Sequence, residues 1–200
     1  MTSDDALAFQ QAVNAFDAIH AGDPRLVDWG AGPEPFAIRY HAVVARWVDS
    51  LAPSASVELR LAARAQHLGR YAVPRASFPE GNTGYKRWRS TLARRQADAA
   101  AAIVRTVGFE ETIAERVGDL IMKKRLSSDP EAATLEDAAC LTFLEIELGP
   151  FVEKTAPEKV TDILQKTWRK MSASGKAAAL ALLPSLAPAL RSVVQRALED

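Results

Sequence analysis

Apolar residues recur along most of this chain at intervals of three and four positions, the spacing of one face of an α-helix. Alternating runs of β-branched residues, which indicate half-buried strands, are missing. The pattern therefore predicts an all-α protein without a sheet. We expect helices over residues 4–21, 36–51, 57–68, 84–107 and 110–123, one capped by Thr134, one beginning at Pro157, and two short helices divided near Pro184.

Residues that start and stop helices divide this pattern into elements. Gly108 is the expected C-terminal glycine of the long helix, and Thr155–Glu158 has the spacing of a capping box. Glycine and proline predict loops over residues 30–35 and 70–83. We therefore expect one helical domain over residues 1–172. Residues 173–200 form a C-terminal helical hairpin that packs on the same domain or, alternatively, serves as a homo-oligomer contact.

Composition narrows the class of protein. With 200 residues, 48% of them hydrophobic, the chain is long and apolar enough to bury its own core. The lone Cys140 excludes an internal disulfide, and the first residues do not resemble a secretory signal, so we expect a cytoplasmic protein. No apolar run reaches the roughly 18 to 20 residues that a membrane span needs. The 25 cationic and 25 anionic residues balance, so a nucleic-acid partner is not expected, although basic residues gather between Arg60 and Arg95.

The segment Leu61–Arg70 holds the most informative histidine. His67 ends an apolar helix, His41 stands 26 positions before it, and Asp137 follows 70 positions after it. These residues and intervals resemble those of HD-domain phosphohydrolases. The resemblance implies an HD-like helical bundle in which His41, His67 and Asp137 hold a divalent metal. The chain departs from that pattern because Leu68 replaces the expected aspartate and cannot bind a cation.

A second resemblance covers almost the whole chain. It is similar to an uncharacterised bacterial and fungal family built on a domain of unknown function, some fungal members of which are labelled glutamyl-tRNA synthetase. Nothing in this chain resembles the nucleotide-binding motifs of such a synthetase. The phrases that carry the resemblance are Ala65–His67, Val73–Arg75, Gly84–Arg89, Leu135–Asp137 and Lys166–Ser172.

Basic residues around His67 predict a pocket for a small anionic ligand, phosphorylated or nucleotide-like, which the protein binds and perhaps hydrolyses. Arginine offers a planar fork to phosphate or carboxylate, an indole ring stacks on a flat ligand, and histidine does acid–base chemistry near neutral pH. Lysine at position 123, where HD proteins often have histidine, repels a metal and attracts an anion. The expected ligand-binding residues are Arg70, Arg75, Trp88, Arg89 and Lys123, and the expected catalytic residues are His67, Glu136 and Asp137.

Two alternatives remain open at this point. The first is a metal-dependent hydrolase or oxygenase with a single divalent metal on His41, His67 and Asp137, because two histidines and one carboxylate suit non-haem iron. The second is a non-enzymatic module in which the same charges bind a protein or RNA. The sequence does not decide whether the protein is an enzyme, and it predicts no cofactor other than the metal of the first alternative.

Overall fold

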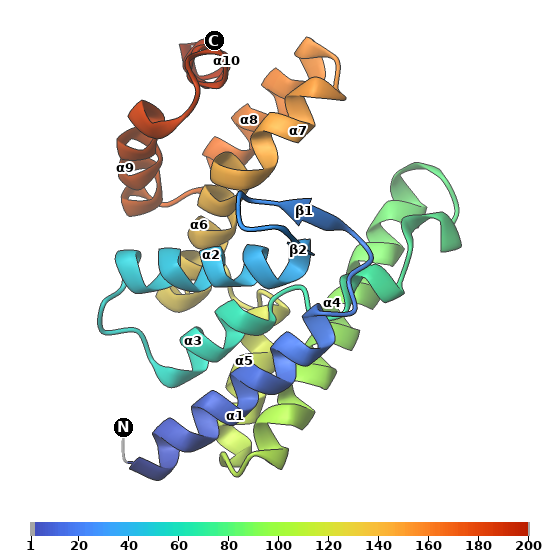
Figure 1. Cartoon of the computed structure of the whole chain (residues 1–200), viewed down its shortest axis with the longest axis vertical. Coiled ribbons are helices and arrows are strands. Elements are labelled where there is room, and N and C mark those ends of the chain that lie inside the picture. The colour runs from blue at the N-terminus through green and yellow to red at the C-terminus, as the bar shows by residue number, and fades with distance from the viewer. Residues whose placement is uncertain (1–2, 200) are drawn as a thin grey trace.

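The computed structural model describes residues 3–199 and is almost entirely helical (Figure 1). Residues 1, 2 and 200, which the expected domain bounds include, lie outside this range. None of the helices within it is long and apolar enough to cross a membrane. The α-helices are α1 (Ser3–His20), α2 (Phe36–Leu51), α3 (Val57–Ala65), α4 (Gly81–Thr106), α5 (Glu111–Ile121), α6 (Pro130–Thr142), α7 (Leu148–Glu153), α8 (Pro157–Lys170), α9 (Ala173–Leu182) and α10 (Pro188–Glu199).

The main apolar core lies among α1 to α6. Helix α2 packs on α3 and α6, while α5 packs on α3 and α4. Each element contributes its apolar stripe, so that Phe16, Val44, Leu61, Leu120 and Leu135 are almost completely buried. Burial of a side chain of this kind stabilises the fold by about 1.5 to 3 kcal/mol. This part confirms the all-α class and places the end of α3 at the centre of the molecule.

A second apolar cluster joins the C-terminal helices to α6. It includes Leu141 and Leu148 from the middle of the chain and Leu164 and Val194 from α8 and α10. Helix α8 packs on α10, and α9 contacts both α6 and α2. In Figure 1 these helices, coloured orange to red, form one end of the molecule. Helix α6 therefore contributes to both apolar clusters.

The expectation of no sheet was wrong at one short hairpin. Strands β1 (Leu26–Asp28) and β2 (Pro33–Pro35) pair antiparallel, partly within the loop expected over residues 30–35. Asp28 accepts hydrogen bonds from the backbone N–H groups of Gly30 and Gly32, at 2.7 and 3.1 Å. Both glycines have φ near +97°, which side chains disfavour. Such a three-residue strand is shorter than any stretch in which alternation can be detected.

The start of α6 and the cap of α8 also differ from expectation. Helix α6 begins four residues before Thr134, because Asp129 accepts hydrogen bonds from two N–H groups of the first turn and Pro130 suits that turn. Thr134 instead donates to the Pro130 carbonyl inside the helix. At α8 the N-cap is Ala156, which has no side-chain bond, so the expected capping box does not form.

The long helix α4 begins earlier than expected and ends as expected. Gly81, with φ +80°, starts it three residues before Gly84. A Cβ atom at Gly84 would lie only 1.8 Å from the Pro79 carbonyl oxygen, so glycine is needed for the close approach of the preceding loop. After the helix, Gly108 adopts φ +102°, which confirms it as the C-terminal glycine.

Candidate functional site

Two cavities meet where α3 ends, and His67 and Arg70 line both of them. Helix α3 stops at Ala65, and Gly69, in the left-handed conformation with φ +61°, turns the chain into the 3-10 helix η1 (Arg70–Ala72). Leu68 is 5% exposed and belongs to the main apolar core, so this position faces away from both cavities. The turn therefore places Leu68 in the apolar core and places His67 and Arg70 on the wall that the two cavities share.

The first cavity, called the basic cavity below, has a volume of about 480 Å³. None of the residues that line it is a carboxylate, although the chain as a whole carries no net charge. Three of the cations that sequence analysis expected, Arg70, Arg89 and Lys123, come together here. The lining consists of the cationic Arg70, Lys86, Arg89, Lys123 and Lys170, together with His67, Gln66, Tyr85, Ser90, Leu92, Ala93, Gln96, Ile121 and Met122.

The charges in the basic cavity act on one another. Neither Arg70 nor Arg89 forms a close ion pair in the described part of the chain, although the charge of Glu147 acts on Arg70 from farther away. Burial, followed by the like charge of Arg89, lowers the pKa of Arg70. Burial and then the charge of Arg70 hold the pKa of His67 well below its usual value, so its imidazole is neutral at pH 7. The cavity is therefore a concentration of positive charge around a neutral histidine.

Lys123 is held at the cavity by an acidic residue behind it. Glu136, which is 6% exposed, accepts a hydrogen bond from the Lys123 amine, and its other oxygen lies 4.0 Å from Lys170. The backbone of Lys123 has φ +56°, an uncommon conformation for a residue with a side chain. Glu136 does not line the basic cavity, so it reaches the cavity through these two amines.

Two buried amides also line the basic cavity. Gln66 is 2% exposed and Gln96 is 5% exposed. Within residues 3–199, neither amide atom of Gln66 has a hydrogen-bond partner, and the Nε2 of Gln96 has none. Buried polar atoms are nearly always paired, because an unpaired one loses its bonds to water without replacement. These amides thus add unused hydrogen-bonding capacity to the wall that carries the cations.

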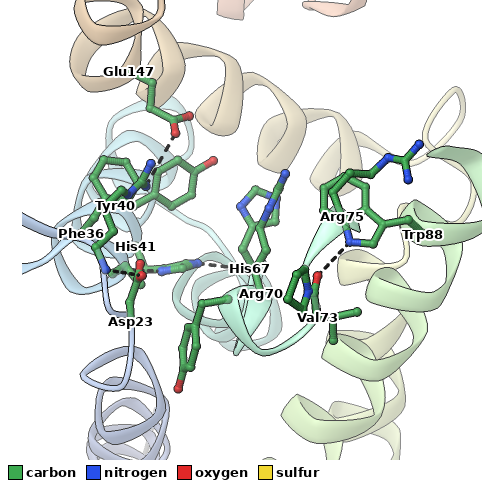
Figure 2. Close-up of a pocket in the computed structure, with 14 residues that line it drawn as sticks. Asp23, Phe36, Tyr40, His41, His67, Arg70, Val73, Arg75, Trp88 and Glu147 are labelled. Carbon is green, nitrogen blue, oxygen red and sulfur yellow. Dashed lines mark hydrogen bonds and ion pairs between the residues drawn. The ribbon is translucent and has the colours of Figure 1, made fainter. Parts of the chain in front are cut away.

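The second cavity, called the aromatic cavity below, has a volume of about 410 Å³ and is drawn in Figure 2. Rings and arginines dominate its walls, and it includes two carboxylates. It lies between α2, the η1 turn, the start of the hairpin and α4. The lining consists of Asp23, Arg25, Phe36, Ala37, Tyr40, His41, His67, Arg70, Tyr71, Val73, Pro74, Arg75, Trp88 and Glu147.

Sequence analysis missed Tyr40, Glu147 and Arg25. Glu147 ends η3 (Phe143–Glu147), a π-helical segment of a kind that often occurs at functional sites. Burial raises the pKa of its carboxyl, and Arg25, 4.0 Å away, opposes that rise. The Arg25 guanidinium lies over the Phe36 ring, 3.1 Å from its centre. The Tyr40 hydroxyl has no hydrogen-bond partner among the described residues, and burial raises its pKa, so it remains a donor.

His41 uses both ring nitrogens on backbone groups. Its Nδ1 donates to the Ala37 carbonyl at 2.6 Å, so its Nε2 is the acceptor for the His67 backbone N–H at 3.2 Å. Its ring stacks on His20, with centres 3.8 Å apart, and His20 in turn bonds to the Arg64 carbonyl at 2.9 Å. Burial keeps the pKa of His41 well below its usual value. No lone pair of His41 is left to bind a metal ion.

Asp137 lies outside both cavities. Its two oxygens accept hydrogen bonds from the backbone N–H of Ser172, at 2.9 Å, and from the Ser172 hydroxyl. A Cβ atom at Gly175 would come within 2.4 Å of this carboxylate, so the start of α9 packs directly on it. The structure therefore does not bring Asp137 to His41 and His67. Within residues 3–199, no three His, Cys, Asp or Glu side chains form a group that could hold a metal ion.

Arg75 and Trp88 both line the aromatic cavity, and both also hold the loop before α4. Arg75 donates to the Phe78 carbonyl at 2.9 Å, and the Trp88 indole N–H donates to the Val73 carbonyl at 2.9 Å. Trp88 is 8% exposed, and the Arg70 guanidinium lies 5.1 Å from the centre of its ring. The indole face that sequence analysis expected to stack on a ligand is therefore occupied by Arg70, which it orients toward the shared wall.

Comparison with known proteins places the chain in a family. No curated protein and no solved structure matches it. A family model described as "Domain of unknown function (DUF4202)" matches residues 10–194, a range that includes every residue of both cavities. The chain thus belongs to this family of domains of unknown function.

Proposed function

We propose that this protein binds a small anionic metabolite, with a phosphate group as the best fit, in the basic cavity. The observation that carries the proposal is the convergence of five cationic side chains on one cavity whose lining has no carboxylate. The chain has no net charge, so this concentration is local and is not a consequence of overall composition.

Repulsion between cations supports a bound anion as the missing partner. After burial, the like charge of Arg89 is the next largest cause that lowers the pKa of Arg70, and Lys123 is held close by. A phosphate group placed among them replaces this repulsion with charge-assisted hydrogen bonds, which the planar guanidinium fork forms in pairs. A half-buried site strengthens such bonds because water screens them less.

His67 is the group that we assign to acid–base chemistry. Its imidazole is neutral, and neither ring nitrogen has a hydrogen-bond partner among the described residues. A neutral imidazole next to a bound phosphate ester accepts a proton from water while the water oxygen bonds to phosphorus and the ester P–O bond breaks, and the imidazolium then returns that proton to the leaving alkoxide. Glu136 then contributes by holding Lys123 and Lys170, whereas Asp137 ties the C-terminal helices to α6.

We also infer a relation to the HD-domain bundle in which cations have taken the place of metal ligands. The position after His67 carries Leu68, which is buried in the core, and Lys123 stands at the cavity where HD proteins often have histidine. The lone pairs of His41 serve backbone groups. These three features favour an anion without an essential metal.

Calorimetric titration with pyrophosphate at low ionic strength tests the proposal. We expect Arg89→Gln to weaken binding at least tenfold, because one charge-assisted bond is worth about 1.5 to 3 kcal/mol. Arg94→Gln is the matched control, because Arg94 lies on the same helix but is exposed and outside the basic cavity. Equal affinity of wild type and Arg89→Gln, or no binding by wild type, would refute anion binding at this site.

A further inference from the structure

The aromatic cavity adjoins the basic cavity at a shared wall. His67 and Arg70 line both, and Arg70 is oriented there by the Trp88 ring. A ligand whose anionic group contacts Arg70 in the basic cavity therefore has the aromatic cavity directly beside it. With about 410 Å³, that cavity has room for a ring of the size found in metabolites.

The charge of the aromatic cavity differs from that of its neighbour. Its two carboxylates, Asp23 and Glu147, face three arginines, of which Arg25 lies 4.0 Å from Glu147 and Arg75 is bonded to a backbone carbonyl. Two carboxylates thus stand against three cations here, whereas the basic cavity has five cations in its lining and one carboxylate, Glu136, behind them. The two halves of the site select different chemistry, an anion in one and an uncharged group in the other.

The aromatic cavity contains an unpaired, uncharged donor, the hydroxyl of Tyr40. Tyr40 is 6% exposed, and its hydroxyl has no partner within residues 3–199. Figure 2 shows this hydroxyl directed toward His67, and the two rings have centres 5.3 Å apart. Phe36 and Tyr40 supply flat walls beside this donor.

We propose that the ligand is a phosphate ester of a flat, uncharged ring that carries hydrogen-bond acceptors. Its phosphate occupies the basic cavity and its ring occupies the aromatic cavity, where the Tyr40 hydroxyl donates to it. This inference rests on the proposed function, because it assumes the anion in the basic cavity, and it adds the class of ligand and a second half-site.

The test compares inorganic phosphate with 4-methylumbelliferyl phosphate, a flat ester with acceptor oxygens, by calorimetry. Wild type is expected to bind the ester at least tenfold more tightly than phosphate. An alanine-to-leucine substitution can then fill each cavity separately, because Ala37 lines only the aromatic cavity and Ala93 lines only the basic cavity. Ala37→Leu is expected to reduce ester binding to the level of phosphate without changing phosphate binding, and Ala93→Leu is expected to weaken both.

A smaller change guards against misfolding of the filled variants. Tyr40→Phe removes one hydroxyl and is expected to weaken ester binding about three- to tenfold while phosphate binding stays constant. Equal affinities of wild type for the two probes, or unchanged ester binding in both Ala37→Leu and Tyr40→Phe, would overturn the aromatic half-site while phosphate binding still upholds the proposed function. Absence of phosphate binding by wild type overturns both proposals.

Discussion

Replacing Asp137 with alanine removes the carboxylate that ties α9 to α6. Two hydrogen bonds from Ser172 are lost, and Ser172 is also the N-cap of α9, accepting from the Gly175 N–H at 3.1 Å. A bond to a charged group contributes about 1.5 to 3 kcal/mol, and the two bonds share one carboxylate. We therefore expect Asp137→Ala to lower the free energy of unfolding by about 3 to 5 kcal/mol.

Urea unfolding followed by circular dichroism measures this loss, and hydrogen exchange locates it. Amide protection is expected to fall first in residues 172–199, because these lose their attachment to the main core. Asp162→Ala is the matched control, since Asp162 forms only an exposed pair with Lys166 and is expected to cost less than about 0.5 kcal/mol. A loss below about 1 kcal/mol for Asp137→Ala, together with abolished anion binding, would show that Asp137 belongs to the ligand site and that our structural assignment is wrong.

Three further predictions concern stability. Burial lowers the pKa of His20 and His41, so below about pH 6.5 the unfolded chain binds protons that the folded chain does not. The free energy of unfolding should therefore be highest above that pH and fall below it by up to about 1.4 kcal/mol per pH unit for each group. Equal free energies from urea titrations at pH 7.5 and 5.5 would contradict this. Arg116→Met should cost about 1.5 to 3 kcal/mol at pH 7. This cost should shrink in acid, because Arg116 lowers the pKa of Asp129 to about 2. The stabilisation by the ion pair is lost as the pH falls from about 4 toward 2. If Arg116→Met costs as much at pH 2 as at pH 7, the ion pair is not the source of the cost. Arg125→Gly should raise stability by about 0.5 to 1 kcal/mol, because Arg125 is exposed with φ +57°; a lower melting temperature would reveal a stabilising role of its side chain.

The helices could be predicted because their apolar periodicity extends over many residues. The β1–β2 hairpin could not, because it depends on one aspartate that accepts hydrogen bonds from two glycine N–H groups in a four-residue turn. The start of α6 was misplaced for a related reason. Asp129-Pro130 interrupts a helix in most contexts, but here the same two residues cap one and begin it.

The basic part of the candidate site could be predicted, because its cationic side chains lie near one another in the sequence or are brought together by the expected bundle. His67, Arg70, Arg89 and Lys123 do line one cavity. Tyr40 could not be predicted, because the apolar periodicity of residues 36–51 indicates that its ring is inside the protein but not where its hydroxyl points. The partner of Asp137 is 35 residues away at Ser172, beyond any local pattern.

The π-helical segment η3 connects α6 to α7, and the aromatic cavity depends on the number of residues in this connection. A π-turn holds one residue more than an α-turn, and Glu147 stands at the end of that segment. Deleting one residue there would restore a continuous α-helix and rotate everything after it by about 100°. Glu147 would then leave the cavity, and α7 would present a different face to its neighbours. The path from α6 to α7 therefore cannot lose a residue without dismantling the aromatic cavity.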